Sequence, residues 1–422
     1  MKTKKNLIFY VVLLLVFTTI GIISSNINFN DYHRKISSWL SVPNKSFIES
    51  NDIKIIKIKF NKEDNQHFKR LFKDYIPELD PSKENANSKF LSYYSENNNW
   101  KKNTLTINGD SFDVKIKSHG RTPFEHKFGK YFSLSIKFKS KPFPFFSKRV
   151  NFVIYNRIQL SSEILKLLSS KFNLYSPKFE LVSASVGKSG DYYYFIEERI
   201  NEDFFIARNL PMVIFNDNID GSLIYNGNIK TTELSKRLIK ELKDRDDLSS
   251  ELKFQIKNDY LNFNESILKK NMNSLKQFFD MDYMSRLNAF RTVYGSDGHG
   301  FASTNIEMAY DTVSRLFYPI NHRDMISTTL INCKYPYEFM DSKREKIPFW
   351  ILLDSDSVFR EKTSQQVKIF LSNNNKNSVK KELDSIHEFY KSAYNYEFSY
   401  INNVFDGKSI IENIECLEKI YN

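Results

Sequence analysis

The hydrophobic pattern changes once along the chain, and this change most constrains the fold. Up to about residue 200, apolar and charged residues alternate, as in DIKIIKIKF over 52–60, which is typical of strands with one buried face. After Thr231, apolar residues recur at helical spacing among Lys and Glu. The pattern predicts an α+β fold with two lobes, a strand-rich lobe over 51–205 and a mainly helical lobe over 206–422.

Local signals predict individual elements within this frame. The run TLTINGDSFDVKIK alternates on both sides of Asn108-Gly109, a dipeptide favoured in two-residue hairpin turns. The predicted elements are hairpins over 104–117 and 179–200, helices over 161–172 and 281–294, and a strand pair over 306–310 and 316–320.

The amino terminus carries a long apolar run after MKTKK. Leu7–Ser24 approaches the roughly 20 residues that a helix needs to cross a bilayer. We expect a retained transmembrane anchor over 1–25 and a polar connector over 26–50, with a cleaved signal peptide as the alternative. The three lysines before the run outnumber Arg34 and Lys35 after it. A single-pass protein of the cell membrane is therefore expected, with its main domain on the non-cytoplasmic side.

The net charge of +12 does not by itself indicate nucleic acid as a partner. The lysines are spread along the predicted strands and helices and form no dense run, which favours a solvated surface near anionic lipid. The two cysteines, Cys333 and Cys416, are compatible with one disulfide outside the cytoplasm. Their spacing is not that of a zinc site.

Basic residues within KIKSHGRTPFEHKFGKYFSLSIKF, residues 115–138, suit a phosphate group. Arg121 follows a turn and supplies a fork of donors, and Lys130 and Lys137 lie on or beside the next strand. These three residues are candidates for binding a nucleotide. A β-hairpin with solvated basic side chains is the alternative.

Two carboxylates are further nucleotide-binding candidates. A protein kinase uses an acid on a helix to hold a lysine over the nucleotide phosphates, and Glu163 lies on the predicted central helix. Its alternative role is that of a charge near a helix start. Glu197 and Glu198 are adjacent on a strand and point to opposite faces, so at most one faces a cleft.

The loop GSDGHGFASTN, residues 295–305, holds two more candidates. Asp297 could accept a proton from a hydroxyl, and Asn305 could bind a metal ion beside phosphate oxygens, although a purely structural glycine-rich loop explains the same residues. A His-Arg-Asp triplet ends at Asp324. A kinase catalytic loop has Asn five residues after this Asp, where the chain has Thr329, so the triplet alone does not indicate that loop.

In their order, these blocks resemble the CotH family of spore-coat and exported kinase-like proteins. The resemblance covers about residues 53–359 and rests on VKIKSHGRT, KYFSLSIKF, YFIEERI and SDGHGFASTN, followed by YPI and an acidic residue. It implies a protein-kinase-like two-lobed fold with ATP and Mg²⁺ as cofactors. It also implies roles for Arg121 and Lys137 on the phosphates, Asp297 as base, and Asn305 and Asp324 as metal ligands.

The function implied by the resemblance is that of a membrane-anchored atypical kinase. It would transfer the γ-phosphoryl group of ATP to a hydroxyl of a protein or of another envelope polymer. The alternative is a catalytically inactive structural or assembly protein of the cell envelope or spore coat. This alternative is favoured by Arg323, which stands where the family carries its acid, one residue before Asp324.

Overall fold

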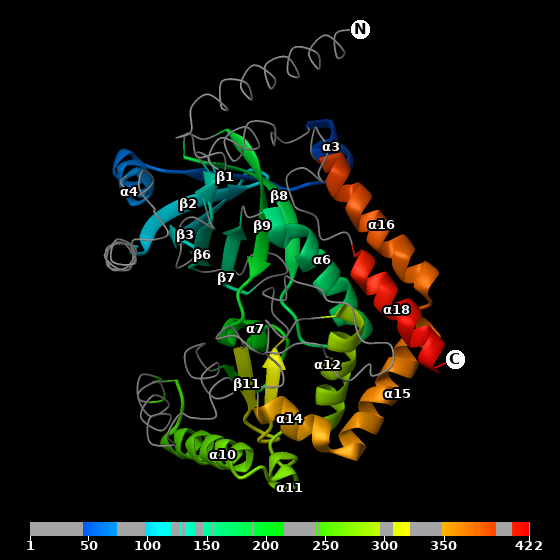
Figure 1. Cartoon of the computed structure of the whole chain (residues 1–422). Helices are drawn as coiled ribbons and strands as arrows, with labels where there is room; N and C mark the ends of the chain where they lie inside the picture. Colours follow the sequence, from blue (N-terminus) through cyan, green and yellow to red (C-terminus); the bar gives the residue numbers. More distant parts are fainter. Residues whose placement is uncertain are drawn as a thin grey trace, which may run out of the picture.

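The structure is a computed structural model with a barrel of strands in one half and most of the helices in the other (Figure 1). The residues that it describes are 45–73, 98–119, 127–128, 131–139, 147–153, 156–187, 190–214, 242, 245, 247–295, 307–320, 348–393 and 407–421.

The barrel is closed and has the strand order β1-β2-β3-β6-β7-β9-β8. Its strands are β1 (Ile55–Lys59), β2 (Lys101–Ile107), β3 (Asp110–Ser118), β6 (Leu134–Phe138), β7 (Arg149–Val153), β8 (Phe179–Val186) and β9 (Asp191–Glu198). A separate pair is formed by β4 (Lys127–Phe128) and β5 (Tyr131–Phe132). The short strand β1 closes the barrel, because it pairs antiparallel with β2 and parallel with β8.

The closed barrel shows that the predicted protein-kinase-like two-lobed fold is wrong. Alternation along a strand indicates which of its faces is buried, but it does not indicate which strand pairs with its edge. The closing contact joins Ile55 and Ser183, which are far apart in the sequence. No local pattern could indicate this pairing.

The interior of the barrel is apolar, as the alternation predicts. Ile56, Ile136 and Tyr194 are examples of its buried residues. The predicted turn between β2 and β3 is confirmed, with φ angles of 46° at Asn108 and 101° at Gly109. Both angles are positive, which is the requirement of the turn type that Asn-Gly favours.

Helices cover one side of the barrel and form the other half of the molecule (Figure 1). They are α3 (Lys45–Ser50), α4 (Lys62–Lys73), α6 (Asn156–Lys171), α7 (Glu202–Ile206), α10 (Ser250–Leu268), α11 (Met272–Leu275), α12 (Met281–Tyr294), α14 (Pro348–Ser355), α15 (Ser357–Asn373), α16 (Lys376–Ala393) and α18 (Lys408–Tyr421). A three-stranded antiparallel sheet lies among them, formed by β10 (Met212–Ile214), β11 (Glu307–Asp311) and β12 (Phe317–Ile320).

One apolar core joins the outer face of the barrel to these helices. It includes Leu181 and Phe195 from the barrel, Leu168 from α6 and Phe290 from α12. Helix α3 falls inside the segment predicted as a connector and docks on α16, since the ring centroids of Phe47 and Phe389 are 5.1 Å apart. The core is therefore continuous across the predicted boundary between the two lobes.

The predicted transmembrane helix over 1–25 lies outside the described residues. Within the part of the chain that the structure describes, no helix is long and apolar enough to span a bilayer.

Candidate functional site

Four basic side chains lie side by side on adjacent strands of the barrel. Lys115 on β3 pairs with Lys137 on β6, and Lys137 pairs with Arg149 on β7. Directly after β9, the Arg199 N–H donates to the Arg149 carbonyl at 3.1 Å. The residues on either side of Lys137 are buried inside the barrel, so its side chain points outward. We call Lys115, Lys137, Arg149 and Arg199 the cation row.

Among the residues that the structure describes, the cation row lacks matching carboxylates. None of its four members forms an ion pair with any residue that the structure describes. The next outward-facing pair differs, because Asp113 on β3 lies opposite Lys139, the residue directly after β6, and their side chains are 3.1 Å apart. Like charges placed directly opposite each other destabilise a sheet. Repulsion within the cation row is therefore expected to lower the stability of the barrel wall.

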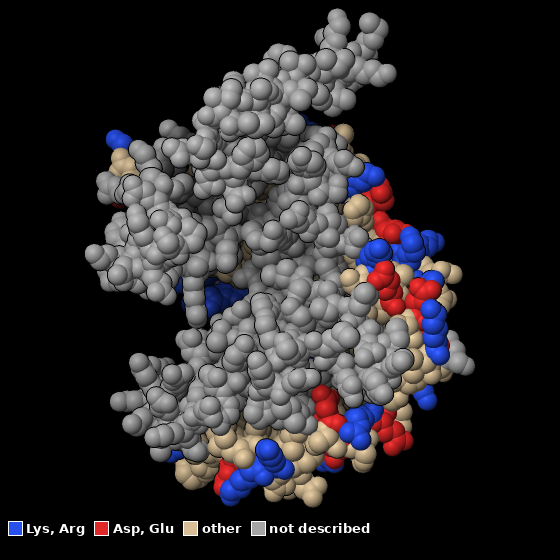
Figure 2. Space-filling view, viewed as in Figure 1, with Lys and Arg blue, Asp and Glu red and all other residues tan. Residues whose placement is uncertain are grey.

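A cavity of about 490 Å³, which we call the basic cleft, lies against the cation row. Its barrel wall contains Lys115, Lys137, Phe138, Lys139, Lys148 and Arg149, and its opposite wall contains Asn201, Glu202, Asp203, Arg245 and Asp247. Figure 2 shows Lys and Arg side chains at the bottom of a hollow beside the barrel, at the level of β7 and α7 in Figure 1. Small-molecule sites typically have volumes of roughly 300–1,000 Å³.

The acids of the opposite wall do not neutralise the barrel wall. Arg245 binds Glu202 through Nη1 and Asp247 through Nη2, each at 2.8 Å. Two of the three acids in the lining are thus paired with a cation of their own wall. The barrel wall keeps its positive charge, and a ligand in the basic cleft meets that charge directly.

The pKa of Lys117 reflects the positive potential of this face. It is half-buried on β3, and its Nζ lies 5.1 Å from the centre of the Trp100 ring. Burial lowers the pKa of the Lys117 amine below its ordinary value of 10.5, and the charges of Arg199 and Arg149 lower it further. Three cations therefore act on one another here.

A chain of polar side chains runs across β6, β7 and β9, one outward-facing position along from the cation row, and reaches His119 after β3. Ser135 donates to Asn151 Oδ1 at 3.0 Å, and Asn151 Nδ2 donates to Glu197 Oε2 at 3.1 Å. The ring Nδ1 of His119 lies 3.0 Å from the Ser135 hydroxyl. Because that hydroxyl uses its proton on Asn151, it accepts from His119, so Nδ1 of His119 carries a proton. We call these four residues the polar row.

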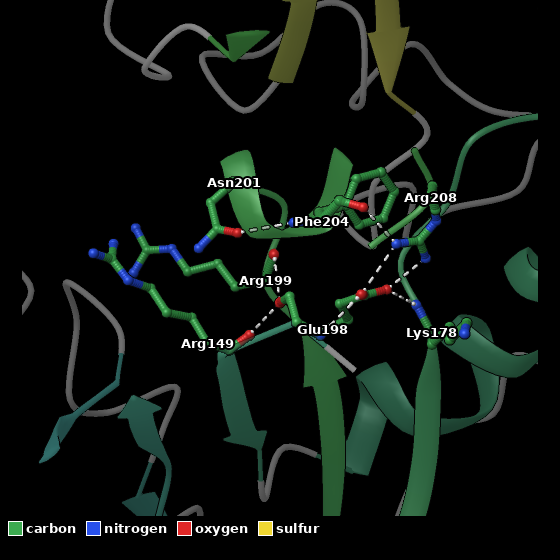
Figure 3. Close-up of polar contacts among 8 residues, drawn as sticks. Arg149, Lys178, Glu198, Arg199, Asn201, Phe204 and Arg208 are labelled. Carbon is green, nitrogen blue, oxygen red and sulfur yellow. Dashed lines mark hydrogen bonds and ion pairs between the residues drawn. The ribbon is translucent and has the colours of Figure 1, made fainter. Parts of the chain in front are cut away.

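Glu198 points away from the cation row and joins the barrel to the segment after it (Figure 3). Its carboxylate accepts from Arg208 at 3.1 Å and 2.6 Å, from the Ser147 N–H at 3.2 Å and from the Lys178 N–H at 3.2 Å. The Arg208 guanidinium also lies 3.6 Å from the centre of the Phe204 ring on α7. Glu198 therefore holds α7, and with it the opposite wall of the basic cleft, against β9.

Three of the predicted nucleotide-binding residues are among the residues that the structure describes. Lys137 lies in the barrel wall of the basic cleft, and Glu197 lies in the polar row of the same face. Glu163 lies on α6, 3.5 Å from Lys166, and is not part of the cleft lining. Burial raises the pKa of the Glu163 carboxyl, while Lys166 acts in the opposite direction. The structure brings Lys137 and Glu197 to one face and places Glu163 elsewhere.

The other predicted site residues lie outside the described residues; they are Arg121, Lys130, Asp297, Asn305 and Asp324. Among the residues that are described, no group of three or more His, Cys, Asp or Glu side chains could hold a metal ion. The predicted metal ligands, Asn305 and Asp324, are not among those described residues.

Sequence reasoning missed Lys115, Arg149 and Arg199. Each occupies an outward-facing position in an alternating run, next to buried residues such as Ile116 and Val150. Alternation could have indicated that these side chains leave the barrel. Only the register between strands shows that they meet in one row.

No family model matches the chain, and a search of curated proteins returns no match. The resemblance to the CotH family therefore stays a prediction from the sequence.

Proposed function

We propose that the basic cleft binds the phosphate groups of ATP and that the chain transfers the γ-phosphoryl group to a hydroxyl of a protein or envelope polymer. The observation that carries this proposal is the row formed by Lys115, Lys137 and Arg149, three cations in direct register without carboxylate partners among the described residues. A bound polyphosphate group would remove the repulsion between them.

The residue types of the wall suit phosphate. Arg149 offers a planar fork of donors that matches two phosphate oxygens, whereas Lys115 and Lys137 act as point charges. Phosphoryl transfer depends mainly on positioning the phosphates and neutralising their charge, which is what a cationic wall provides. The cleft volume of about 490 Å³ lies within the range typical of small-molecule sites.

The remaining parts of the reaction are assigned by the sequence resemblance. Asp297 would accept the hydroxyl proton, and Asn305 and Asp324 would hold Mg²⁺, which when bound neutralises charge on the transferred phosphoryl group. Membrane attachment through residues 1–25 and a non-cytoplasmic position of the main domain belong to the same proposal.

The first test is calorimetric titration of the full chain with ATP and Mg²⁺. We expect binding in the wild type and weaker binding in Lys137→Gln. The matched control is Lys57→Gln, which makes the same change at an exposed position on β1, between β2 and β8. Absence of binding heat in the wild type, or an equal loss in both variants, would contradict the proposal.

The second test separates binding from chemistry. Transfer of labelled phosphate from ATP is measured for the wild type and for Asp297→Asn, with ATP binding as the parallel readout. Loss of transfer with retained binding supports Asp297 as the base. A wild type that binds ATP but transfers no phosphate to itself or to envelope material would point to the inactive assembly protein instead.

A further inference from the structure

The cation row is longer than a triphosphate needs. It crosses the four adjacent strands β3, β6, β7 and β9, and neighbouring strands lie about 4.8 Å apart, so the row extends over roughly 14 Å. In a phosphate chain, each P–O–P link is shorter than one strand spacing. The two links of a triphosphate therefore cover only part of the row.

Arg199 forms the end of the row that a triphosphate on Lys115, Lys137 and Arg149 leaves open. Figure 3 shows the Arg149 and Arg199 side chains running in the same direction, away from Glu198. Arg199 is exposed, forms no ion pair with a described residue and lies just outside the cleft lining. Lys148, which directly precedes Arg149, is another exposed cation of the cleft lining.

We infer that the cation row binds a linear polymer of phosphate groups, longer than a triphosphate, along its whole length from Lys115 to Arg199. The argument is charge complementarity: cations on four successive strands of the barrel surface fit a flexible chain of anions, whereas a single phosphate would leave at least one end of the row unmatched. This inference rests on the proposed function, because it concerns the same cleft. It adds the class of ligand, a linear polymer of phosphate groups.

Inorganic polyphosphate fits this row better than single-stranded nucleic acid does. Proteins that bind single strands usually combine basic residues with aromatic side chains on which the bases stack. The aromatic residue in the described lining is Phe138, and its ring belongs to the core inside the barrel. The described lining thus provides charge without a stacking surface, and Trp100, whose ring lies beside Lys117, is outside that lining.

The experiment is a chain-length series on the full chain. Dissociation constants are measured at fixed ionic strength for orthophosphate, pyrophosphate, triphosphate, ATP and a long inorganic polyphosphate. We expect affinity to keep rising beyond the triphosphate. The slope of log affinity against log salt for the long chain should fall by about one in Arg199→Gln. The advantage of the long chain over ATP should fall in the same variant, and Lys57→Gln should change neither.

The outcomes distinguish this inference from the proposed function. Affinity that stops rising at the triphosphate, or a loss in Arg199→Gln that is equal for ATP and for the long chain, overturns the polymer inference and leaves ATP binding intact. Tight polyphosphate binding without ATP binding overturns the proposed function alone. An oligodeoxythymidylate of equal charge that binds as tightly as polyphosphate would show a nucleic-acid site and would also overturn the inference.

Discussion

Neutralising the centre of the cation row should make the unliganded protein more stable while it weakens phosphate binding. Lys137 lies directly opposite Lys115 on one side and Arg149 on the other. A charged pair at such a position changes stability by about 0.2–1 kcal/mol, and like charges act in the unfavourable direction. Lys137→Gln removes two unfavourable pairs, so we expect a gain of about 0.4–2 kcal/mol in the free energy of unfolding. The substitution leaves the barrel core intact, because the Lys137 side chain is outside it.

The assay is urea-induced unfolding without ligand, at low salt and in 1 M NaCl. The screening length falls to about 3 Å in 1 M salt, so a gain caused by relieved repulsion should shrink there. Lys139→Gln is the matched control on the neighbouring outward-facing position, where the lysine is paired with Asp113. Both partners are exposed, so this change should lower stability slightly or leave it unchanged.

Two results would refute the reasoning about the row. The first is a loss of stability in Lys137→Gln at low salt, which would mean that Lys137 makes favourable contacts. The second is a gain of equal size at low and high salt, which would assign the effect to side-chain entropy or propensity and not to charge.

Three further predictions concern other groups. Glu198→Gln should lower the free energy of unfolding by about 3 kcal/mol, measured by urea unfolding, because Arg208 then loses its buried carboxylate partner. Burial, and then the hydrogen bond to Asp259, raises the pKa of Tyr310 to about 12. An unfolded tyrosine loses its proton near 10, so stability should fall between pH 10 and 12, and Tyr310→Phe should flatten this part of the stability profile. Since burial lowers the pKa of Lys117, phosphate affinity should begin to fall at a pH below 10.5, and Lys117→Gln should remove that part of the binding pH profile.

The local elements were largely predictable because their signals are local. The Asn108-Gly109 turn sets the β2–β3 hairpin, and the predicted second hairpin corresponds to β8 and β9. The helix predicted over 281–294 agrees with α12, which begins after the capping side chain of Asp280 and ends at Gly295 in the left-handed conformation. Closure of the barrel was not predictable, since it depends on a parallel contact between segments remote in sequence.

The candidate site was predictable only in part for the same reason. A single basic residue on a strand, such as Lys137, can be proposed from its type and from alternation. Whether such a residue belongs to a row of cations depends on which residues lie opposite it on the neighbouring strands. The register between the strands determines this. The adjacent acids show the same limit: alternation correctly separates Glu197 and Glu198, but only the fold shows that Glu197 joins the polar row and Glu198 binds Arg208.

The opposite effects of Lys137 on stability and on binding lead to one more measurable consequence. A ligand that binds only the folded state stabilises it by RT ln(1 + [L]/Kd). If Lys137→Gln gains about 1 kcal/mol without ligand and no longer binds, the wild type becomes the more stable protein once triphosphate exceeds about four times its Kd. The two stability curves should therefore cross as triphosphate is added. Curves that stay parallel would show that triphosphate does not bind at Lys137. Lys137 would then not be part of the phosphate site in the basic cleft.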